Sequence, residues 1–154
     1  MKGLLMKEMS ANSVFSREYI LAMLKSDYAL PVPPAARVDV GVRFLVIANF
    51  HDAILQAVNA GQRYGKPYVA VSTDFRWGDT GQFKNGYTQF VLRFTDVRNF
   101  IMPEFDGTVY ILGVGVYQNG DRLTVQWDLN YFVGNEPYYR TFVVDCGGVE
   151  VSAM

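Results

Sequence analysis

The chain has 154 residues, the size of one domain, and can bury a sizeable hydrophobic core without cross-links. Hydrophobic residues make up 50% and aromatic residues 15%, which is typical of a packed globular protein and not of a disordered one. A formal net charge of -1 leaves no electrostatic footprint for nucleic acid or for an anionic membrane surface.

The single cysteine, Cys146, excludes an intrachain disulfide and indicates a reducing compartment. No apolar run approaches the roughly 20 residues that a membrane-spanning helix needs. Near the N-terminus, Lys7 and Glu8 interrupt the apolar residues, so the run is too short for the core of a signal peptide. These features predict a cytoplasmic location without membrane association.

The N-terminal part divides into two segments. Residues 1–12 carry no strong periodic pattern and are expected to be disordered or an addition to the natural chain. Residues 13–36 predict one helix followed by a Pro-rich linker, with Ser16 as N-cap and an end before the PVPP sequence at 31–34. The apolar stripe of this helix consists of Ile20, Met23 and Leu24, with Phe15 as a further candidate. We expect it to cover one end or edge of a sheet.

Residues 37–154 predict a single β domain, because the hydrophobic period changes to two from Arg37. The first inward face consists of Val38, Val40, Val42, Phe44 and Val46. The next apolar run, FHDAILQAV at 50–58, favours a strand, with a helical turn as the alternative.

The runs Lys66–Arg76 and Tyr87–Asp96 alternate in the same way and predict a hairpin with a long loop. In the first run the inward residues are Val69, Val71, Thr73 and Phe75, and the outward residues are Tyr68, Ser72, Asp74 and Arg76. In the second run Phe90, Leu92 and Phe94 face inward. The brief run at 97–102 ends at Pro103.

The strongest signal in the chain is a hairpin from Thr108 to Phe132 around Asn119-Gly120, a pair typical of a two-residue type I′ turn. That turn places Gln118 opposite Asp121 and fixes every further pair. The predicted core pairs are Val116/Leu123, Val114/Val125, Leu112/Trp127 and Tyr110/Leu129. The predicted outer pairs are Tyr117/Arg122, Gly115/Thr124, Gly113/Gln126, Ile111/Asp128 and Val109/Asn130.

Two further strands complete the domain. The run 138–146 places Phe142 and Val144 inward, and Gly147-Gly148 turns the chain into a short last strand, VEV. Seven to eight strands at short spacing after one helix predict a mainly β fold. We expect an antiparallel sandwich or a partly open barrel, with one N-terminal α-helix.

The residues that could take part in catalysis or phosphate binding are interpreted as structural. Neighbouring side chains on a strand point to opposite faces, so His51 and Asp52 are not expected to form a dyad, and His51 is expected to bond a backbone carbonyl at a strand start. Cys146 lies in the inward phase and is expected to be a small buried hydrophobe. Gly113 and Gly115 lie mid-strand and indicate a bend, a bulge or a close backbone approach rather than a phosphate loop. No catalytic residue, metal site or cofactor is predicted.

Two regions are candidates for recognition. The loop 77–86 offers Trp77, Asp79, Phe83 and Lys84 on a rigid scaffold, although Trp77 can equally plug an open end of the sheet. The polar face of the central hairpin offers a flat, small-residue patch: Gly113, Gly115, Thr124, Gln126 and Asp128. We expect this patch to stay accessible and to bind a protein partner.

Three segments together resemble small bacterial β-domains of the polymorphic-toxin immunity kind: FHDAIL at 50–55, LRFTDVRNF at 92–100 and VVDCGGVEV at 143–151. In such domains a His-Asp-Ala strand opens the sheet and a short strand closes it. The resemblance implies a non-enzymatic protein that neutralises a cognate toxin by binding it directly.

The sequence therefore favours a non-enzymatic protein-binding module, with immunity against a toxin as its leading form. One alternative is a structural subunit of a phage or other assembly, such as a decoration, tail or connector protein. A second alternative is a small-ligand-binding β-barrel, which requires an apolar cavity. The expected partner is a toxin or an assembly neighbour, not nucleic acid or membrane, and a homo-oligomer is left open.

Overall fold

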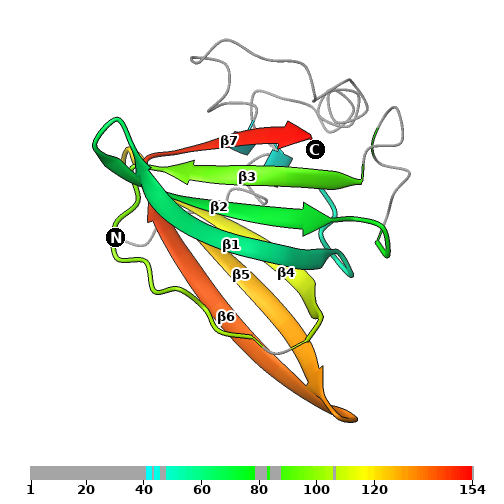
Figure 1. Cartoon of the computed structure of the whole chain (residues 1–154). Helices are drawn as coiled ribbons and strands as arrows, with labels where there is room; N and C mark the ends of the chain where they lie inside the picture. The colour runs from blue at the N-terminus through cyan, green and yellow to red at the C-terminus, as the bar shows by residue number, and fades with distance from the viewer. Residues whose placement is uncertain are drawn as a thin grey trace.

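The computed structural model describes residues 41–42, 44–45, 48–78, 83, 88–105 and 107–153. The predicted helix within 13–36 and the predicted disorder of 1–12 lie outside these residues. The described chain forms seven strands (Figure 1): β1 (Ile54–Arg63), β2 (Lys66–Asp74), β3 (Gln89–Thr95), β4 (Val109–Asn119), β5 (Arg122–Val133), β6 (Glu136–Cys146) and β7 (Gly148–Ala153).

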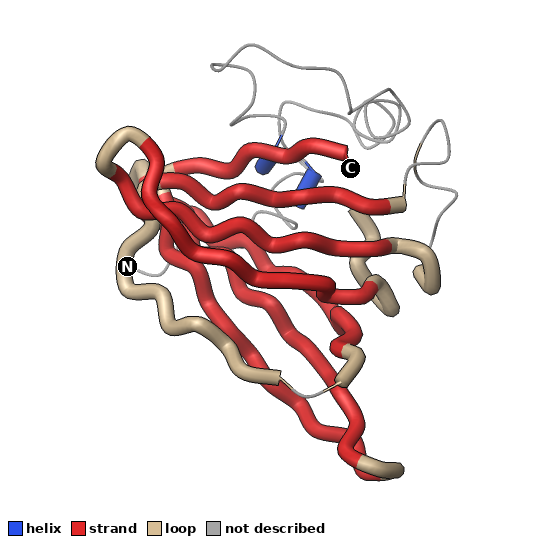
Figure 2. The backbone as a smooth tube through the Cα atoms, viewed as in Figure 1, coloured by secondary structure: helices blue, strands red, loops and turns tan. Residues whose placement is uncertain are grey.

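The prediction of a mainly antiparallel β fold is confirmed, and the strands belong to one open sheet with the order β6-β5-β4-β1-β2-β3-β7. Two meanders, β1–β2–β3 and β4–β5–β6, meet where Ile54 pairs with Tyr110 and Leu55 with Val109. The chain then returns so that β7 pairs with β3. The two halves run at an angle to each other (Figure 2), and we call them the first wing (β1, β2, β3, β7) and the second wing (β4, β5, β6).

The predicted strand over 38–46 is wrong at its described positions, because residues 41–42 and 44–45 are helical and the Ala48 N–H donates to the Phe44 carbonyl oxygen at 2.9 Å. The buried residues of this turn are Gly41, Phe44, Leu45 and Ala48, which is helical spacing. A side chain at Gly41 would collide with the backbone of Val149, so the helical turn packs closely on β7.

The strand favoured within 50–58 is confirmed from Ile54 onward, while residues 51–52 form a turn. In the β2–β3 hairpin all predicted inward side chains are buried. The outward prediction for Asp74 is wrong, because this side chain is only 2% exposed. Its carboxylate accepts the backbone N–H of Arg76 at 2.8 Å and lies 3.0 Å from the Arg76 guanidinium, which satisfies it inside the protein.

The central hairpin forms, but its register differs from the predicted one. Asn119 pairs with Arg122, so the two turn residues are Gly120 and Asp121. Gly120 has a φ of 63°, and Asp121 is not among the residues with positive φ. This combination is typical of a type II′ turn, which takes Gly at its first position. The core pairs near the turn become Val116 with Val125 and Val114 with Trp127.

The pairing of β4 with β5 shifts once more between Ile111 and Gly113, where Leu112 is the extra residue. Such a bulge changes the phase of a strand, so the residues before it exchange faces. Val109 and Ile111, predicted outside, are buried, whereas Leu112, predicted inside, is 37% exposed. Tyr110 pairs with Asn130 instead of the core residue Leu129. Of the alternatives predicted for Gly113 and Gly115, a bend, a bulge or a close backbone approach, the bulge is found next to Gly113.

The core lies between the two wings and centres on Trp127, which is fully buried. Its indole stacks on Phe142 at 5.8 Å between centroids and meets the edges of Phe50 at 5.6 Å and Phe94 at 6.1 Å. One side chain of the second wing therefore contacts the first wing and the segment before β1.

Arg122 holds the same two wings together at a corner. Its Nε donates to Asp145 Oδ1 at 2.8 Å, while its two terminal nitrogens donate to Asp96 Oδ2 at 3.2 Å and to the Asp96 carbonyl oxygen at 2.8 Å. The hydrogen bond to Asp145 raises the pKa of Arg122 above its ordinary value. This contact fixes the start of β5 against the residue that follows β3.

Trp127→Ala is expected to lower the free energy of unfolding by about 3–5 kcal/mol, because it removes the largest buried side chain and leaves a cavity between the wings. Urea denaturation followed by circular dichroism measures the loss. A loss below about 1 kcal/mol would contradict the central position of this indole.

Candidate partner-binding surface

His51 and Asp52 lie in the turn before β1. The prediction that His51 bonds a backbone carbonyl is confirmed, since its Nδ1 lies 3.3 Å from the carbonyl oxygen of Leu112, the bulge residue. The prediction that the two side chains cannot meet is wrong, because Asp52 has a φ of 67° and the segment is not extended. His51 Nε2 lies 3.6 Å from Asp52 Oδ2, and both side chains are exposed to solvent.

Trp77 and Phe83 are the two predicted recognition residues of the loop 77–86 that the structure describes. Trp77 is 64% exposed, but Phe83 is only 6% exposed and stacks on Phe44 at 5.7 Å, so its assignment to a binding surface is corrected. The Phe83 ring packs among the aromatic side chains of the core, although the residue belongs to a loop. Asp79 and Lys84 lie outside the described residues.

The start of this loop lies beside the His51 turn. A Cβ at Gly78 would lie 2.9 Å from the carbonyl oxygen of His51, so only a residue without a side chain fits there. Through His51 and Leu112 the loop start is linked to β4, one residue before Gly113. The two regions predicted separately therefore approach each other at this end of the sheet.

The five predicted patch residues share one face of the second wing, although their partners differ from those predicted. Gly113 pairs with Asp128, Gly115 with Gln126 and Tyr117 with Thr124. We define the outer face by residues of all three strands that are half-exposed or exposed on this side: Tyr110, Gly113, Gly115, Tyr117, Arg122, Thr124, Gln126, Asp128, Asn130, Phe132, Pro137, Tyr139, Thr141, Val143 and Asp145.

The centre of the outer face is flat and internally hydrogen-bonded. Asp128 Oδ1 accepts from Gln126 Nε2 at 3.1 Å and from Thr141 Oγ1 at 3.0 Å, so its carboxylate is held in one position. An added Cβ at Gly113 would meet nothing within 4 Å, so the space above this residue is open. A partner can reach the backbone there without displacing a side chain.

The composition of the outer face is unusual for a solvated surface. It contains no Lys or Glu, and its charged residues are Asp128 in the centre and Arg122 and Asp145 at the turn end, which are hydrogen-bonded to each other. Tyrosines lie at both ends, with Tyr110 and Tyr139 on either side of Asn130 and Tyr117 beside Thr124. Enrichment in Tyr with depletion of Lys and Glu is the pattern of protein–protein interface cores. The aromatic contribution of Tyr110 and Tyr139 was missed, because it requires the bulge and the strand order.

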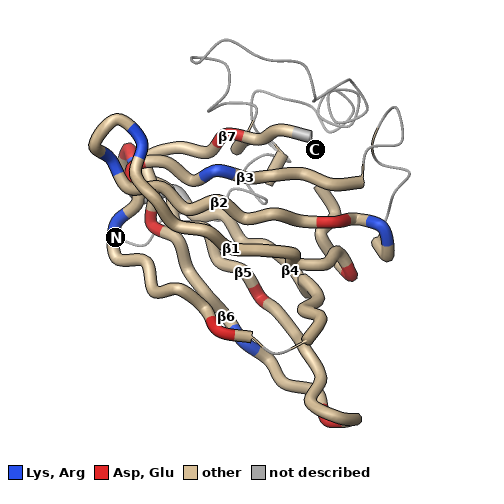
Figure 3. The backbone as a smooth tube through the Cα atoms, in the orientation of Figure 1, with Lys and Arg blue, Asp and Glu red and all other residues tan. Residues whose placement is uncertain are grey.

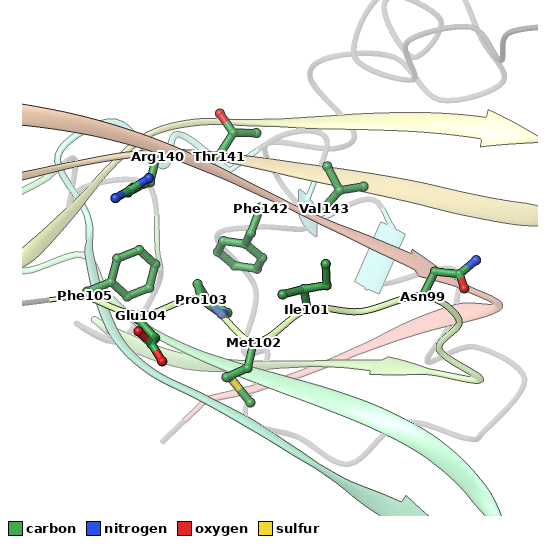
Figure 4. Close-up of a pocket in the computed structure, with 10 residues that line it drawn as sticks. All are labelled: Asn99, Ile101, Met102, Pro103, Glu104, Phe105, Arg140, Thr141, Phe142 and Val143. Atoms are coloured by element: carbon green, nitrogen blue, oxygen red, sulfur yellow. The ribbon is translucent and has the colours of Figure 1, made fainter.

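A groove runs beside β6, between this strand and the residues 99–105, which we call the strap. Its volume is about 620 Å³, and Figure 4 shows Arg140 and Phe142 pointing from β6 toward the strap while Thr141 and Val143 point to the other side. The lining residues from the strap are Asn99, Ile101, Met102, Pro103, Glu104 and Phe105.

Basic residues gather at the β1–β2 turn end of the first wing (Figure 3). Arg63 and Lys66 flank the β1–β2 turn, and Arg93 of β3 lies near them around a second hollow of about 480 Å³. Arg63 and Arg93 each approach Glu150 at 3.9 Å, so one carboxylate is shared by two guanidinium groups. These are solvated surface pairs, which contribute little to stability.

The prediction that Cys146 is buried is confirmed, and burial raises the pKa of its thiol to about 12. A thiol is nucleophilic only as the thiolate, so this residue is not poised for catalysis. Among the described residues no group of three His, Cys, Asp or Glu side chains could hold a metal ion. Within the same part of the chain no helix is long and apolar enough to cross a membrane.

Comparison of the chain with protein-family models, with curated proteins and with solved structures finds no match.

Iodoacetamide is expected to modify Cys146 slowly in the folded chain at about pH 8 and rapidly in urea, because unfolding restores an ordinary thiol pKa. The raised pKa contributes stability below the unfolded pKa of about 8.5, and this contribution is lost as the pH rises toward 12. Mass spectrometry follows the labelling. Equal rates for the folded and unfolded chains would contradict the burial of this thiol.

Proposed function

We propose that this chain is a non-enzymatic protein-binding module whose partner docks on the outer face of the second wing. The composition of that face carries the proposal, since it is Tyr-rich, has no Lys or Glu, holds its one Arg in a hydrogen-bonded pair with Asp145, and is flat at Gly113 and Gly115. Its central carboxylate already has two hydrogen-bond donors, so a partner can cover Asp128 without leaving it unpaired.

The scaffold beneath this face supports the same function. The opposite face of β4 and β5 is packed into the core through Val114, Val116, Val125 and Trp127. A rigid, pre-formed surface loses little conformational entropy when it binds. Trp77 and the His51 turn, at one end of β4, extend the surface with exposed aromatic and polar groups.

A toxin is the first partner to consider, because of the resemblance of residues 50–151 to immunity domains. An immunity protein needs no catalytic group, only a surface that covers a functional part of the toxin. We expect co-expression of this chain to rescue cells from a toxic protein encoded next to it. Rescue should fail when the outer face carries a bulky charge. Loss of rescue by substitutions only outside that face would contradict its assignment.

An assembly subunit is the second candidate, and the free edge of β6 is the observation that favours it, because subunits can join through unpaired strands. The ligand-barrel alternative receives less support, since both larger hollows in the described part are open at the surface.

Gly113→Arg tests the outer face directly. The open space above Gly113 should accept the side chain, so the melting temperature should stay within about 2 °C of the parent, while partner affinity should fall at least about tenfold. Ser72→Arg, at a mid-strand position in the first wing, is the matched control and should leave affinity unchanged. Calorimetry with the co-purified partner measures both variants.

Unchanged affinity of the Gly113→Arg variant, or an equal loss in the Ser72→Arg control, would contradict the proposal. Unfolding of the Gly113→Arg variant would also contradict it, because the residue would then lie in an interior.

A further inference from the structure

The outer edge of β6 carries backbone groups that have no backbone partner among the described residues. The N–H of Arg98 donates to the carbonyl oxygen of Asp145 at 2.8 Å, which shows that Asp145 points away from β5. Backbone groups alternate in direction along an antiparallel strand. The N–H and C=O groups of Tyr139, Thr141 and Val143 therefore point outward as well. Apart from the Arg98 contact, the described chain provides no backbone partner on this edge.

The strap turns away from β6 before it can pair further. Asn99 has a φ of 55°, a left-handed conformation that ends the pairing begun at Arg98. The groove of about 620 Å³ then separates the strap from β6, where an eighth strand would otherwise lie. The opposite edge of the sheet differs, because the helical turn at Gly41 packs on the β7 backbone at Val149. Only the β6 edge is open in this way among the strands described.

The open stretch has defined limits and a centre. At one end Pro137 has no N–H to donate, and at the other end the Asp145 carbonyl is already occupied. Between them lie the three outward-pointing residues, and Thr141 is the middle one. A two-fold axis through Thr141 therefore maps the open stretch onto itself, which is the requirement for a symmetric interface between identical chains.

The side chains fit this symmetric arrangement. With Thr141 opposite Thr141 of a second copy, Tyr139 faces Val143 twice on the outer side, an aromatic and β-branched pair that stabilises sheets. On the strap side Arg140 faces Phe142 twice, and the exposed Glu104 of the groove wall offers a carboxylate to the incoming Arg140. Moving the two-fold axis from Thr141 to Arg140, a slide of two residues, would place Arg140 opposite Arg140, which is unfavourable.

We propose that two copies of this chain associate through antiparallel pairing of their β6 strands, centred on Thr141. The pairing forms about six backbone hydrogen bonds, two from each of the three facing pairs. It joins the two second wings into one continuous sheet and places their outer faces side by side. The inference rests on the open edge and not on the proposed partner, so each can fail without the other.

Thr141→Pro tests the pairing, with Thr141→Val as its matched control. Proline removes an outward N–H that β5 does not use, so the fold should persist, whereas valine keeps the N–H and removes only the side-chain bond to Asp128. Sedimentation equilibrium should give a dimer for the parent and for the Thr141→Val variant, and a monomer for the Thr141→Pro variant. A monomeric parent, or a dimer that survives Thr141→Pro, would overturn the proposal.

Cross-linking keeps the test decisive if the proline variant does not fold. Thiols introduced by Thr141→Cys would face each other across the axis at a separation that a disulfide can span. The Thr141→Cys variant should form a covalent dimer on mild oxidation, and the Tyr139→Cys variant should not. Equal cross-linking of the two variants would overturn the β6 pairing. Absence of cross-linking in the Thr141→Cys variant would overturn it as well, and this is also the result expected if the edge accepts a strand of another protein.

Discussion

The pairing of β4 with β5 determines which side chains the second wing buries and which it presents to solvent. Two local features set it: the turn at Gly120-Asp121 and the bulge at Leu112. The bulge places Val109 and Ile111 in the core, which removes two β-branched side chains from water, and turns Tyr110 outward. It also positions the Leu112 carbonyl oxygen within reach of His51. The Tyr-rich, flat outer face is a consequence of this pairing.

Two contacts keep the second wing against the first wing, so that the inner face of the second wing is shielded from water. Trp127 fills the space between the wings, and Arg122 closes the corner with hydrogen bonds to Asp96 and Asp145. The geometry of the corner also explains the open edge. β6 is followed directly by Gly147, whose N–H donates to the Thr95 carbonyl oxygen at 2.9 Å. The chain thereby leaves the edge of the second wing, and β7 pairs with β3 in the first wing. Within the described part of the chain, no strand then lies beside the outer edge of β6 along Tyr139, Thr141 and Val143.

Local patterns predicted the strands well, because alternation records burial directly. Phe90, Leu92 and Phe94 are buried as the period of two requires. The same pattern failed over 38–46, where Phe44 and Leu45 lie at helical spacing from Gly41 and Ala48. The contact of this helical turn with β7 decides the conformation. The register prediction failed because Asn119-Gly120 and Gly120-Asp121 are both suitable turns. The only sign of the bulge in the sequence is Gly113. Phe83 was assigned to a surface since nothing local shows that a loop side chain enters the core.

The strand order brought together residues that no spacing rule connects, above all Tyr110, Asn130 and Tyr139 in one row. The outer face and the β6 edge both depend on the pairing of β4 with β5, and nuclear magnetic resonance can measure that pairing directly. In non-hydrogen-bonded pairs of antiparallel strands the two Hα atoms lie close together. The account predicts strong Hα–Hα contacts between Val114 and Trp127 and between Val116 and Val125. Strong Hα–Hα contacts between Gly115 and Thr124 and between Tyr117 and Arg122 in their place would contradict it, because these are the non-hydrogen-bonded pairs of the register with an Asn119-Gly120 turn.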